Sequence, residues 1–466
     1  MLDKKARGRG LSPGDAILAG GLPRRAERRA PTTPVSGVRR LLARLDAELA
    51  RVDADKIDRE DRIPPAVLAR LERLGVLRLN LPRAYGGLGL DRADYHRILA
   101  RISARSLALA MIVTTHQSLG AAALVAAFGG PELKAELLPR MAAGELSALA
   151  ASEALSGADP TLAATTARRA RGGWRLDGRK LWVSNAVGAR WIAVLARAPG
   201  GATLFIIDAR TRGVSVERRC RFLGLRGLGN GVLRLRGAFV SDARRVGAEG
   251  EGARILLALL GEGRLTVVPR ALGLTRAARD AARAWMLSRR RRGRALAQEP
   301  AVAARLKRLD ALVARLEALD AAAAAWSRAG GVGRTESALA KLYAAAAAWE
   351  AADAALQLRG ARGYETVDSQ RARGEAAVPA ERWLRDARGL RLVEGSDDLL
   401  RWAVARRGLD LARAGARAPR AAGALGRRAA ALAAEFRALA RARGDAVAAR
   451  ALELADEAAR ILAESL

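Results

Sequence analysis

The spacing of apolar residues changes twice along this 466-residue chain. Between residues 36 and 145, apolar side chains recur three and four positions apart, as in VRRLLARLDAELARV, which is typical of amphipathic helices. Between 146 and 251, short runs bounded by Gly, Asp and Asn alternate apolar and polar residues, as strands do. Helical spacing returns from 252 to 412. The sequence therefore predicts an α+β fold, mainly α: an N-terminal helical domain, a middle antiparallel β domain and a C-terminal helical bundle.

Two further segments flank these three domains. Residues 1–35 are polar, basic and rich in Pro and Gly, so we expect a mobile basic N-terminal arm. Residues 413–466 carry apolar side chains on one helical face, which predicts a short helical C-terminal extension. The run SLALAMIVTTHQSLGAAALVAAFG is apolar almost all round and is expected to be a buried helix. Because Arg or Gly interrupts each apolar run, we expect no transmembrane span and a cytoplasmic protein, peripheral to a membrane at most.

The net charge of +34 is unusual for a globular protein. Arg accounts for nearly all of the basic excess and is spread along the whole chain, so the excess resembles a compositional bias more than one binding surface. Weak non-specific contact with polyanions or membrane surfaces through Arg is expected. One cysteine, Cys220, and two histidines, His96 and His116, cannot supply a typical zinc site, and no metal is expected.

A carboxylate occupies a predicted joint between two helices in RLVEGSDDLLR at 391–401. Gly395 breaks the first helix, and the three residues after it can cap the next one. Alone, this pattern is more often a solvated turn. A second stretch, LDGRKLWVSNA at 176–186, puts Trp182 and Ser184 on the same side of a predicted strand, where an aromatic face could cover a ring system.

These stretches belong to an ordered series that resembles the acyl-CoA dehydrogenase family, most closely its very-long-chain branch. The series covers residues 36 to 412 and consists of LPRAYGGLGL, THQSLG, SEALSGAD, GRKLWVSNA, LGLRGLGN, GEGR, LQLRGARGY, ERWLRDAR and VEGSDDLLR. The resemblance implies FAD as cofactor and FAD-dependent oxidation of an acyl-CoA thioester to its trans-2-enoyl product, as in fatty-acid β-oxidation. It also implies an electron-transfer flavoprotein as electron acceptor, and a homodimer or dimer of dimers.

The resemblance assigns roles to individual positions. Glu394 matches the base that removes the α-proton while hydride leaves the β-carbon for flavin N5. A base for this reaction needs a dry position beside the proton, which a break between helices can provide. In some relatives the base precedes the arginine that matches Arg264; Gly263 stands there, and Glu262 is a poorer competitor. The positions matching the FAD site are Ser152, Gly157, Trp182, Val183, Ser184, Arg289, Gln357, Gly360, Ser396 and Asp398, and those near the substrate are Ala158, Arg264 and Val393. Arg289, Gln357 and Gly360 match contacts to the FAD of a neighbouring subunit.

The chain departs from the family pattern at several positions. Ala154, Ala158, Arg292 and Pro300 replace the residues usual in the flavin motifs, and the additional residues 366–378 are expected to form an exposed loop. Two alternatives therefore stay open. One is a catalytically silent protein with this fold, and the other is a DNA-binding relative, although the C-terminal segment is only mildly basic and has no aromatic series for base stacking.

Overall fold

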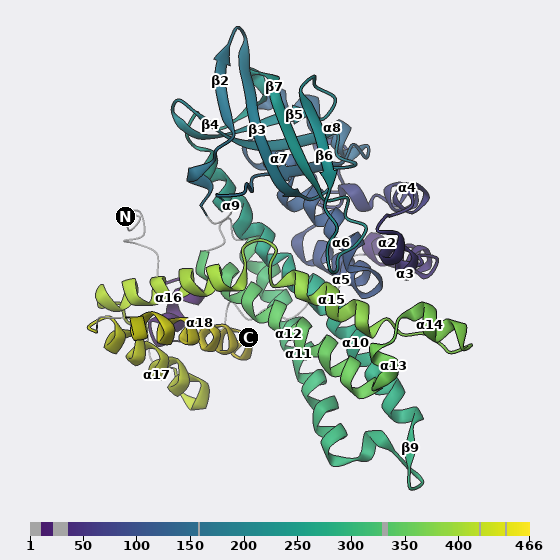
Figure 1. The fold of residues 1–466 in the computed structure, drawn as a ribbon. Coiled ribbons are helices and arrows are strands. Elements are labelled where there is room, and N and C mark those ends of the chain that lie inside the picture. The colour runs from purple at the N-terminus through teal and green to yellow at the C-terminus, as the bar shows by residue number, and fades with distance from the viewer. Residues whose placement is uncertain (1–10, 22–35, 157–158, 329–333, 419–420, 443–444) are drawn as a thin grey trace.

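The computed structural model describes residues 11–21, 36–156, 159–328, 334–418, 421–442 and 445–466. A twisted sheet lies at one end of the molecule, long helices form the opposite end, and a group of shorter helices lies beside their junction (Figure 1). The helical–strand–helical order predicted from the apolar spacing is confirmed.

The N-terminal helical domain is held together by apolar helix faces and by polar caps at helix ends. Asp53, Asp91 and Ser106 accept hydrogen bonds from the first-turn backbone N–H groups of α3, α5 and α6. The helices are α2 (Ser36–Ala50), α3 (Ala54–Glu60), α4 (Pro65–Arg73), α5 (Arg92–Arg105), α6 (Leu107–Thr114), α7 (Ala121–Phe128) and α8 (Pro131–Ala142), with short turns η3 (Val76–Arg78), η4 (Arg83–Tyr85) and η5 (Thr115–Leu119).

The stretch 107–128, which spans α6, η5 and α7, is the one candidate membrane span among the described residues. Its length and apolar composition would suffice to cross a bilayer although Gly120 interrupts it, so an interrupting Gly was not enough to exclude a candidate span. However, 94% of its apolar window is buried inside the protein, as the sequence predicted for this helix. A core helix of this kind carries apolar residues on all sides because protein surrounds it.

The middle domain is one eight-stranded sheet in the order β6-β7-β3-β2-β4-β5-β8, with β1 beside β4. Its neighbours are antiparallel except that β1 and, at a single position, β2 pair with β4 in parallel. The prediction of an antiparallel sheet was therefore incomplete, because apolar alternation carries no information on strand direction. The strands are β1 (Ser147–Ala150), β2 (Thr166–Ala170), β3 (Gly173–Val183), β4 (Trp191–Ala198), β5 (Gly201–Asp208), β6 (Val214–Arg219), β7 (Gly231–Ser241) and β8 (Arg245–Val246), with turns η6 (Pro160–Leu162) and η7 (Asp242–Arg244).

Strand β4 shows how the sheet is covered. Trp191, Ala193 and Leu195 pack in one cluster with apolar residues of α7, α8 and α9 (Gly252–Leu265), whereas Ile192 and Val194 pack in a cluster with Trp174 and Phe205 on the opposite face. Successive side chains of a strand point to opposite faces, so one strand contributes to two cores.

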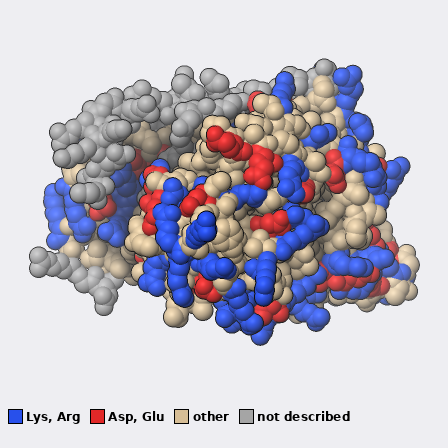
Figure 2. All heavy atoms as spheres, turned by 90° about the horizontal axis from the view of Figure 1, so that it is seen from above, with Lys and Arg blue, Asp and Glu red and all other residues tan. Residues whose placement is uncertain are grey.

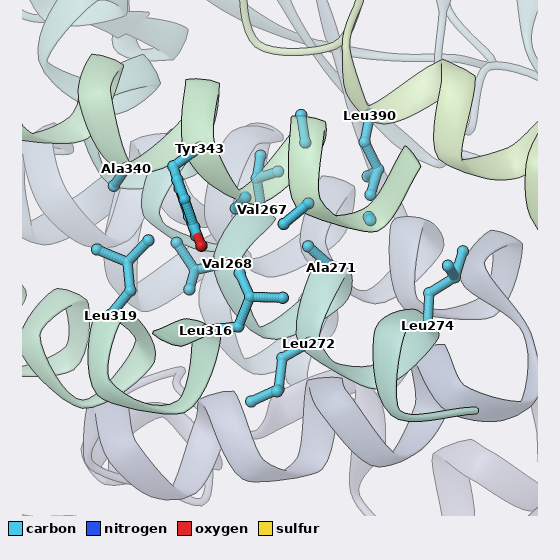
Figure 3. Packing of buried hydrophobic residues seen from close by; sticks show 14 of the residues in the cluster. Val267, Val268, Ala271, Leu272, Leu274, Leu316, Leu319, Ala340, Tyr343 and Leu390 are labelled. Carbon is cyan, nitrogen blue, oxygen red and sulfur yellow. The ribbon is translucent and has the colours of Figure 1, made fainter. Parts of the chain in front are cut away.

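The C-terminal bundle is built around α10 (Val267–Ser288). Its buried residues Val267, Val268, Ala271 and Leu272 lie against side chains of α11 (Pro300–Arg328) and α12 (Arg334–Arg359), as Figure 3 shows. Alanine dominates the buried face of α12, which allows the helices to approach closely. The other elements are the hairpin β9 (Arg290–Arg291) and β10 (Arg294–Ala295), η8 (Leu296–Gln298), α13 (Ala361–Tyr364), α14 (Val367–Ala372), α15 (Ala380–Leu390) and α16 (Asp397–Arg413).

Residues 366–378 are mostly exposed, as we expected, but they are not a loop throughout. They include α14, in which Thr366 caps the helix and Val367 and Gln370 are buried. The Gln370 amide donates to the carbonyl oxygens of Glu365 and Val378 and closes the segment on itself. The sequence was misread because polar residues dominate the segment and one of its two inward-facing residues, Gln370, is itself polar.

The C-terminal extension consists of α17 (Gly423–Leu439) and α18 (Asp445–Ser465), which pack with α16. Phe436 of α17 lies against Gly408 of α16, where an added Cβ would come within 2.6 Å of the Phe436 ring. A fourth helix, α1 (Pro13–Leu18), completes this group, and its Ile17 and Leu18 are buried. The prediction of a mobile arm over 1–35 was therefore wrong for residues 11–21, because two large apolar side chains gain more from burial than the short helix loses in freedom.

Candidate functional site

Glu394 lies in the turn between α15 and α16, as the sequence predicted. Its φ is +55°, a left-handed conformation that is uncommon for a residue with a side chain. The carboxylate is buried, with 2% of the side chain exposed, and its Oε1 accepts a hydrogen bond from Arg270 Nη2 at 2.8 Å. The other oxygen, Oε2, is buried and has no hydrogen-bond partner among the described residues. The reading of this pattern as a solvated turn is therefore excluded.

Two cations from different helices, together with Arg391 at the end of α15, fix the turn that carries Glu394. Arg264 of α9 donates to the Glu394 carbonyl oxygen at 3.0 Å, and Lys341 of α12 donates to the Gly395 carbonyl oxygen at 3.0 Å. Asp397 accepts from Lys341 Nζ at 2.7 Å and from Arg391 Nε at 2.6 Å. Burial lowers the pKa of Lys341, and the Asp397 carboxylate acts in the opposite direction. Hydrogen bonds from other helices thus hold the left-handed backbone conformation of Glu394.

Arg270 is the partner of Glu394 that sequence reasoning missed. Its side chain is fully buried and comes from the middle of the apolar run VVPRALGL in α10. Nε donates to the Thr266 carbonyl oxygen at 2.9 Å, and Nη2 also reaches the Thr266 hydroxyl at 3.2 Å. The available signal was an arginine at a core position of a helix, because a buried cation requires a partner anion.

The competing carboxylate Glu262 does not lie beside Glu394. Its Oε2 accepts from the Ser327 hydroxyl at 2.5 Å and lies 3.6 Å from Arg92. Gly263, in contrast, faces the site: a Cβ added there would lie 3.7 Å from Glu394 Cγ. The two positions that the resemblance offers for the base therefore lie close together, and only one of them carries a carboxylate.

The end of β3 carries the predicted ring-covering residues, but their geometry differs from the prediction. Trp182 has a φ of +54° and lies where the register of β3 with β7 is irregular, so Trp182 and Ser184 do not follow the alternation of a regular strand. The Trp182 side chain is half exposed, Val183 is buried, and the Ser184 hydroxyl donates to Asn230 Oδ1 at 3.0 Å. Ser152 is joined to this strand, because its carbonyl oxygen accepts from the Leu181 N–H at 2.9 Å. Gly157 and Ala158 lie outside the described residues.

A buried ion pair that was not predicted supports this edge of the sheet. Lys180 Nζ lies 2.6 Å from Glu153 Oε1, and the backbone N–H groups of Ala164 and Thr165 donate to the same carboxylate. Burial raises the pKa of Glu153, but the hydrogen bonds from Lys180 and Thr165 outweigh burial and bring the pKa to about 2. Glu153 therefore stays ionised and fixes the segment that follows Ser152.

Arg289, Gln357 and Gly360 lie at the far end of the bundle from Glu394. All three are exposed at the C-terminal ends of α10 and α12. The Arg289 guanidinium lies 5.0 Å from the Trp285 ring centroid, and Arg359 and Arg362 contact the same ring at 4.7 and 5.5 Å. Arg289 follows Arg270 by nineteen positions, roughly 28 Å along the axis of α10. One subunit therefore cannot bring both ends of α10 to the same small-molecule site.

The remaining predicted positions surround the turn. Ser396 is the N-cap residue of α16 but makes no side-chain capping bond, so the predicted cap by its hydroxyl was wrong. Asp398 is exposed and pairs with Arg401 at 2.9 Å, and Val393 is half-buried beside Glu394. Among the described residues, no three His, Cys, Asp or Glu side chains lie close enough together to hold a metal ion.

Two distant motifs of the ordered series meet beside this turn. Asp386 of ERWLRDAR accepts a hydrogen bond from the N–H of Leu225 in LGLRGLGN at 2.6 Å. Burial raises the pKa of Asp386 to about 6, against the influence of Arg382 and of the Leu225 N–H. Leu225 also packs on Gly389, where an added Cβ would lie 2.6 Å from Leu225 Cδ1. These contacts connect the middle domain to α15, the helix that leads to Glu394.

A β domain between two helical domains, with a buried glutamate at the joint of two bundle helices, is the arrangement expected of an acyl-CoA dehydrogenase. Family models for the N-terminal, middle and C-terminal domains of acyl-CoA dehydrogenases match residues 38–145, 148–238 and 250–409 in that order. An acyl-CoA dehydrogenase of Bacillus subtilis is 30% identical over 360 residues, which cover 76% of this chain and 92% of that protein. The chain belongs to the acyl-CoA dehydrogenase family.

Similarity to one group of relatives is higher but covers only part of their length. The probable acyl-CoA dehydrogenase FadE10 of Mycobacterium tuberculosis is 38% identical over 381 residues. The match covers 79% of this chain and 58% of that protein, so the chain spans less than two thirds of the FadE10 sequence.

Solved structures show the same fold. An acyl-CoA dehydrogenase from Bacillus anthracis, complexed with FAD, superposes with a TM-score of 0.82 at 22% identity and covers 98% of this chain and 85% of that chain. Butyryl-CoA dehydrogenase from Megasphaera elsdenii gives 0.74 at 22% identity, with coverages of 80% and 97%. The similarity to the Bacillus anthracis structure therefore includes the C-terminal extension of this chain.

Proposed function

We propose that the chain is an FAD-dependent acyl-CoA dehydrogenase in which Glu394 removes the α-proton of an acyl-CoA thioester. The observation that carries the proposal is the buried Oε2 of Glu394, for which the described part of the chain offers no hydrogen-bond partner, although Arg270 binds Oε1. A buried acceptor without a partner is costly, and the α-C–H of a bound thioester would face it. Family membership and the FAD-bound structural neighbour support the same reaction.

Two segments would hold the flavin, the end of β3 and the turn that follows Glu394. Trp182 presents a half-exposed indole at the end of β3, and Ser152, Val183 and Ser184 lie next to it. Ser396 and Asp398 follow the base on the other side. FAD, when bound, supplies the acceptor for the hydride that leaves the substrate β-carbon. Trp182 would cover the ring system with an apolar face, and the cations around the turn would hold Glu394 toward the substrate.

The residues of this chain perform the proton chemistry. Glu394 Oε2 takes the α-proton, and negative charge develops on the thioester oxygen as the C–H bond weakens. The backbone N–H of Glu394 donates to no group among the described residues, so it is available to that oxygen. Burial excludes water, which would otherwise compete for the carboxylate.

A substitution of the base tests this proposal. Glu394→Gln keeps the shape and removes the base, so kcat should fall by about 10³-fold or more while the purified protein keeps its flavin absorbance. Glu262→Gln is the matched control and should retain activity, because Glu262 is bound to Ser327 and Arg92. Turnover by the Glu394 variant at the rate of the parent protein would place the base elsewhere. A colourless protein that FAD cannot reconstitute would favour the catalytically silent alternative.

We further propose that two chains build each FAD site, with an electron-transfer flavoprotein as electron acceptor. The exposed Arg289, together with Gln357 and Gly360, would contact the FAD of a neighbouring subunit, since guanidinium groups pair well with phosphates. Light scattering is expected to give a dimer or a dimer of dimers. Arg289→Met should lower the FAD content of the purified protein without dissociating it, and a monomer that binds FAD fully would contradict the shared site.

The order of motifs supports the very-long-chain branch and a role in fatty-acid β-oxidation. We also propose a cytoplasmic location. An anaerobic titration with acyl-CoAs of increasing chain length, followed by flavin bleaching, would rank the substrates.

A further inference from the structure

The segment between β6 and β7 contacts both the helix of the proposed base and the strand end of the proposed flavin site. Figure 1 shows α15, the helix that leads to Glu394, at the junction of the sheet and the bundle. Residues 223–230, here called the connecting loop, join that helix to the turn after β3. The proton chemistry and the flavin contacts proposed above make no use of this loop.

One end of the connecting loop is bound to α15. Asp386 Oδ1 accepts a hydrogen bond from the Leu225 N–H at 2.6 Å, and Arg385 Nη1 donates to the Leu223 carbonyl oxygen at 3.0 Å. Leu225 has a φ of +54°, a conformation that is costly for leucine and persists only where surrounding contacts hold it. Gly224 permits the close approach, because a Cβ added there would lie 2.4 Å from the Arg385 carbonyl oxygen. The loop is therefore fixed against the backbone of α15.

The other end of the connecting loop is bound to the turn that follows β3. The Val187 N–H donates to the Gly229 carbonyl oxygen at 3.1 Å. Asn230 is buried, and its Oδ1 accepts from the Ser184 hydroxyl at 3.0 Å. Ser184 is one of the residues that we propose beside the flavin. The loop thus forms a continuous series of contacts from the helix of the base to the strand end of the flavin site.

Asp386 is a buried carboxylate whose place in this series is specific. Its neighbours on α15, Arg382 and Arg385, pair with Asp55 and Asp58 of α3, and Asp386 itself accepts from the Leu225 N–H. Burying a carboxylate is costly unless it accepts hydrogen bonds. A position that required only packing would carry an apolar residue.

We propose that Asp386 is a positioning residue, which fixes the separation between Glu394 and the flavin-facing end of β3 through the connecting loop. This inference rests on the proposed function, because it takes Glu394 as the base and a flavin beside Ser184 as the hydride acceptor. Asp386 acts through the loop and not on the substrate. Reaction rates depend steeply on such separations, and a displacement of about 1 Å can lower a rate about 100-fold.

Two thioesters separate the two steps of the reaction on the FAD-loaded protein. Octanoyl-CoA gives up both a proton and a hydride, so anaerobic flavin bleaching measures hydride transfer. In 3-thiaoctanoyl-CoA, sulfur replaces the β-carbon, so this probe has an α-proton but no hydride to give. Exchange of its α-proton in D2O therefore measures the base alone. If the titration above ranks another chain length first, the two probes take that length.

The ratio of the bleaching rate to the exchange rate reports the geometry between the base and the flavin. Asp386→Ala removes the acceptor for Leu225 and should lower this ratio at least about tenfold. Asp386→Asn keeps an oxygen that can accept the same hydrogen bond and should restore most of the ratio. Gly224→Ala places a Cβ against the backbone of Arg385 and should lower the ratio although Asp386 is intact. This variant decides the question if Asp386→Ala does not fold.

The control for lost stability is Leu309→Ala, at a buried position of α11 in the core of the bundle. It should leave the ratio unchanged. An unchanged ratio in Asp386→Ala, or an equal fall in Asp386→Asn or in Leu309→Ala, would overturn the inference while leaving the proposed function intact. If the parent protein neither bleaches with octanoyl-CoA or its homologues nor exchanges the α-proton, the proposed function fails instead.

Discussion

Two buried carboxylates, Glu394 and Glu153, show how partners decide the role of a residue. Each oxygen of Glu153 has a hydrogen-bond partner, whereas for Glu394 the residues that the structure describes provide a partner for Oε1 and none for Oε2. Amino-acid composition does not predict the burial of either residue, because a glutamate is more often exposed. A buried carboxylate whose two oxygens both accept hydrogen bonds stabilises the fold, whereas one with an oxygen left without a partner can accept a proton.

Removing the partner of Glu153 should destabilise the protein. Lys180→Met leaves a buried carboxylate without its cation, and the free energy of unfolding should fall by about 3 kcal/mol in a urea titration. The adjacent Arg179 pairs with Glu217 on the surface, where both side chains are about two-fifths exposed. Arg179→Met is the control and should cost less than about 1 kcal/mol. Equal effects of the two substitutions would contradict a special role for the buried pair.

The same pair predicts a dependence on pH. The pKa of Glu153 is about 2 in the folded protein, below its ordinary value of 4.5. Its contribution to stability is therefore complete above pH 4.5 and is lost as the pH falls toward 2. Burial lowers the pKa of Lys180 as well, so the pair stabilises less than the pKa of Glu153 alone suggests. The difference in stability between the parent protein and Lys180→Met should shrink over this range of pH.

At the scale of elements, the short helix α1 has more influence than its length suggests. It contacts α12, α16, α17 and α18, and Asp15 binds Arg407 at 2.6 Å and the Thr335 hydroxyl at 2.9 Å. The helix therefore connects the bundle to the C-terminal extension. A segment this short is not stable alone, so its order comes from tertiary packing.

Truncating the buried side of α1 should affect stability strongly. Ile17→Ala creates a cavity between α1 and its neighbours and should cost about 3 kcal/mol of unfolding free energy. Leu11→Ala, at a residue that is 39% exposed, is the control and should change the stability by less than about 0.5 kcal/mol. Chemical denaturation of both variants measures the difference. A negligible effect of Ile17→Ala would show that α1 is not part of the cooperative unit.

At the scale of the whole molecule, the charge of +34 is distributed rather than concentrated. Blue and red side chains alternate over the face shown in Figure 2, and many arginines are paired with carboxylates. Distributed charge of this kind attracts polyanions without selecting a sequence. The surface therefore gives no specific support to the DNA-binding alternative.

Binding to DNA should accordingly be weak, insensitive to sequence and dependent on salt. The affinity for a duplex of random sequence is expected to fall by at least about tenfold between 50 and 200 mM salt, because bound counterions are released. Fluorescence anisotropy with two unrelated duplexes measures both properties. A strong preference for one duplex at high salt would favour the DNA-binding alternative.

The sequence by itself determined the order of domains, the burial of the 107–128 helix and the placement of Glu394 on a joint between helices. Local spacing and glycine breaks encode these features, and they need no knowledge of distant residues. Only the tertiary structure decided that Oε2 of Glu394 has no hydrogen-bond partner among the described residues, that Arg270 faces Oε1, and that Ile17 and Leu18 of α1 are buried. These features depend on contacts between segments more than 100 positions apart in the chain, as between Arg270 and Glu394, and no local pattern specifies which distant side chain completes them.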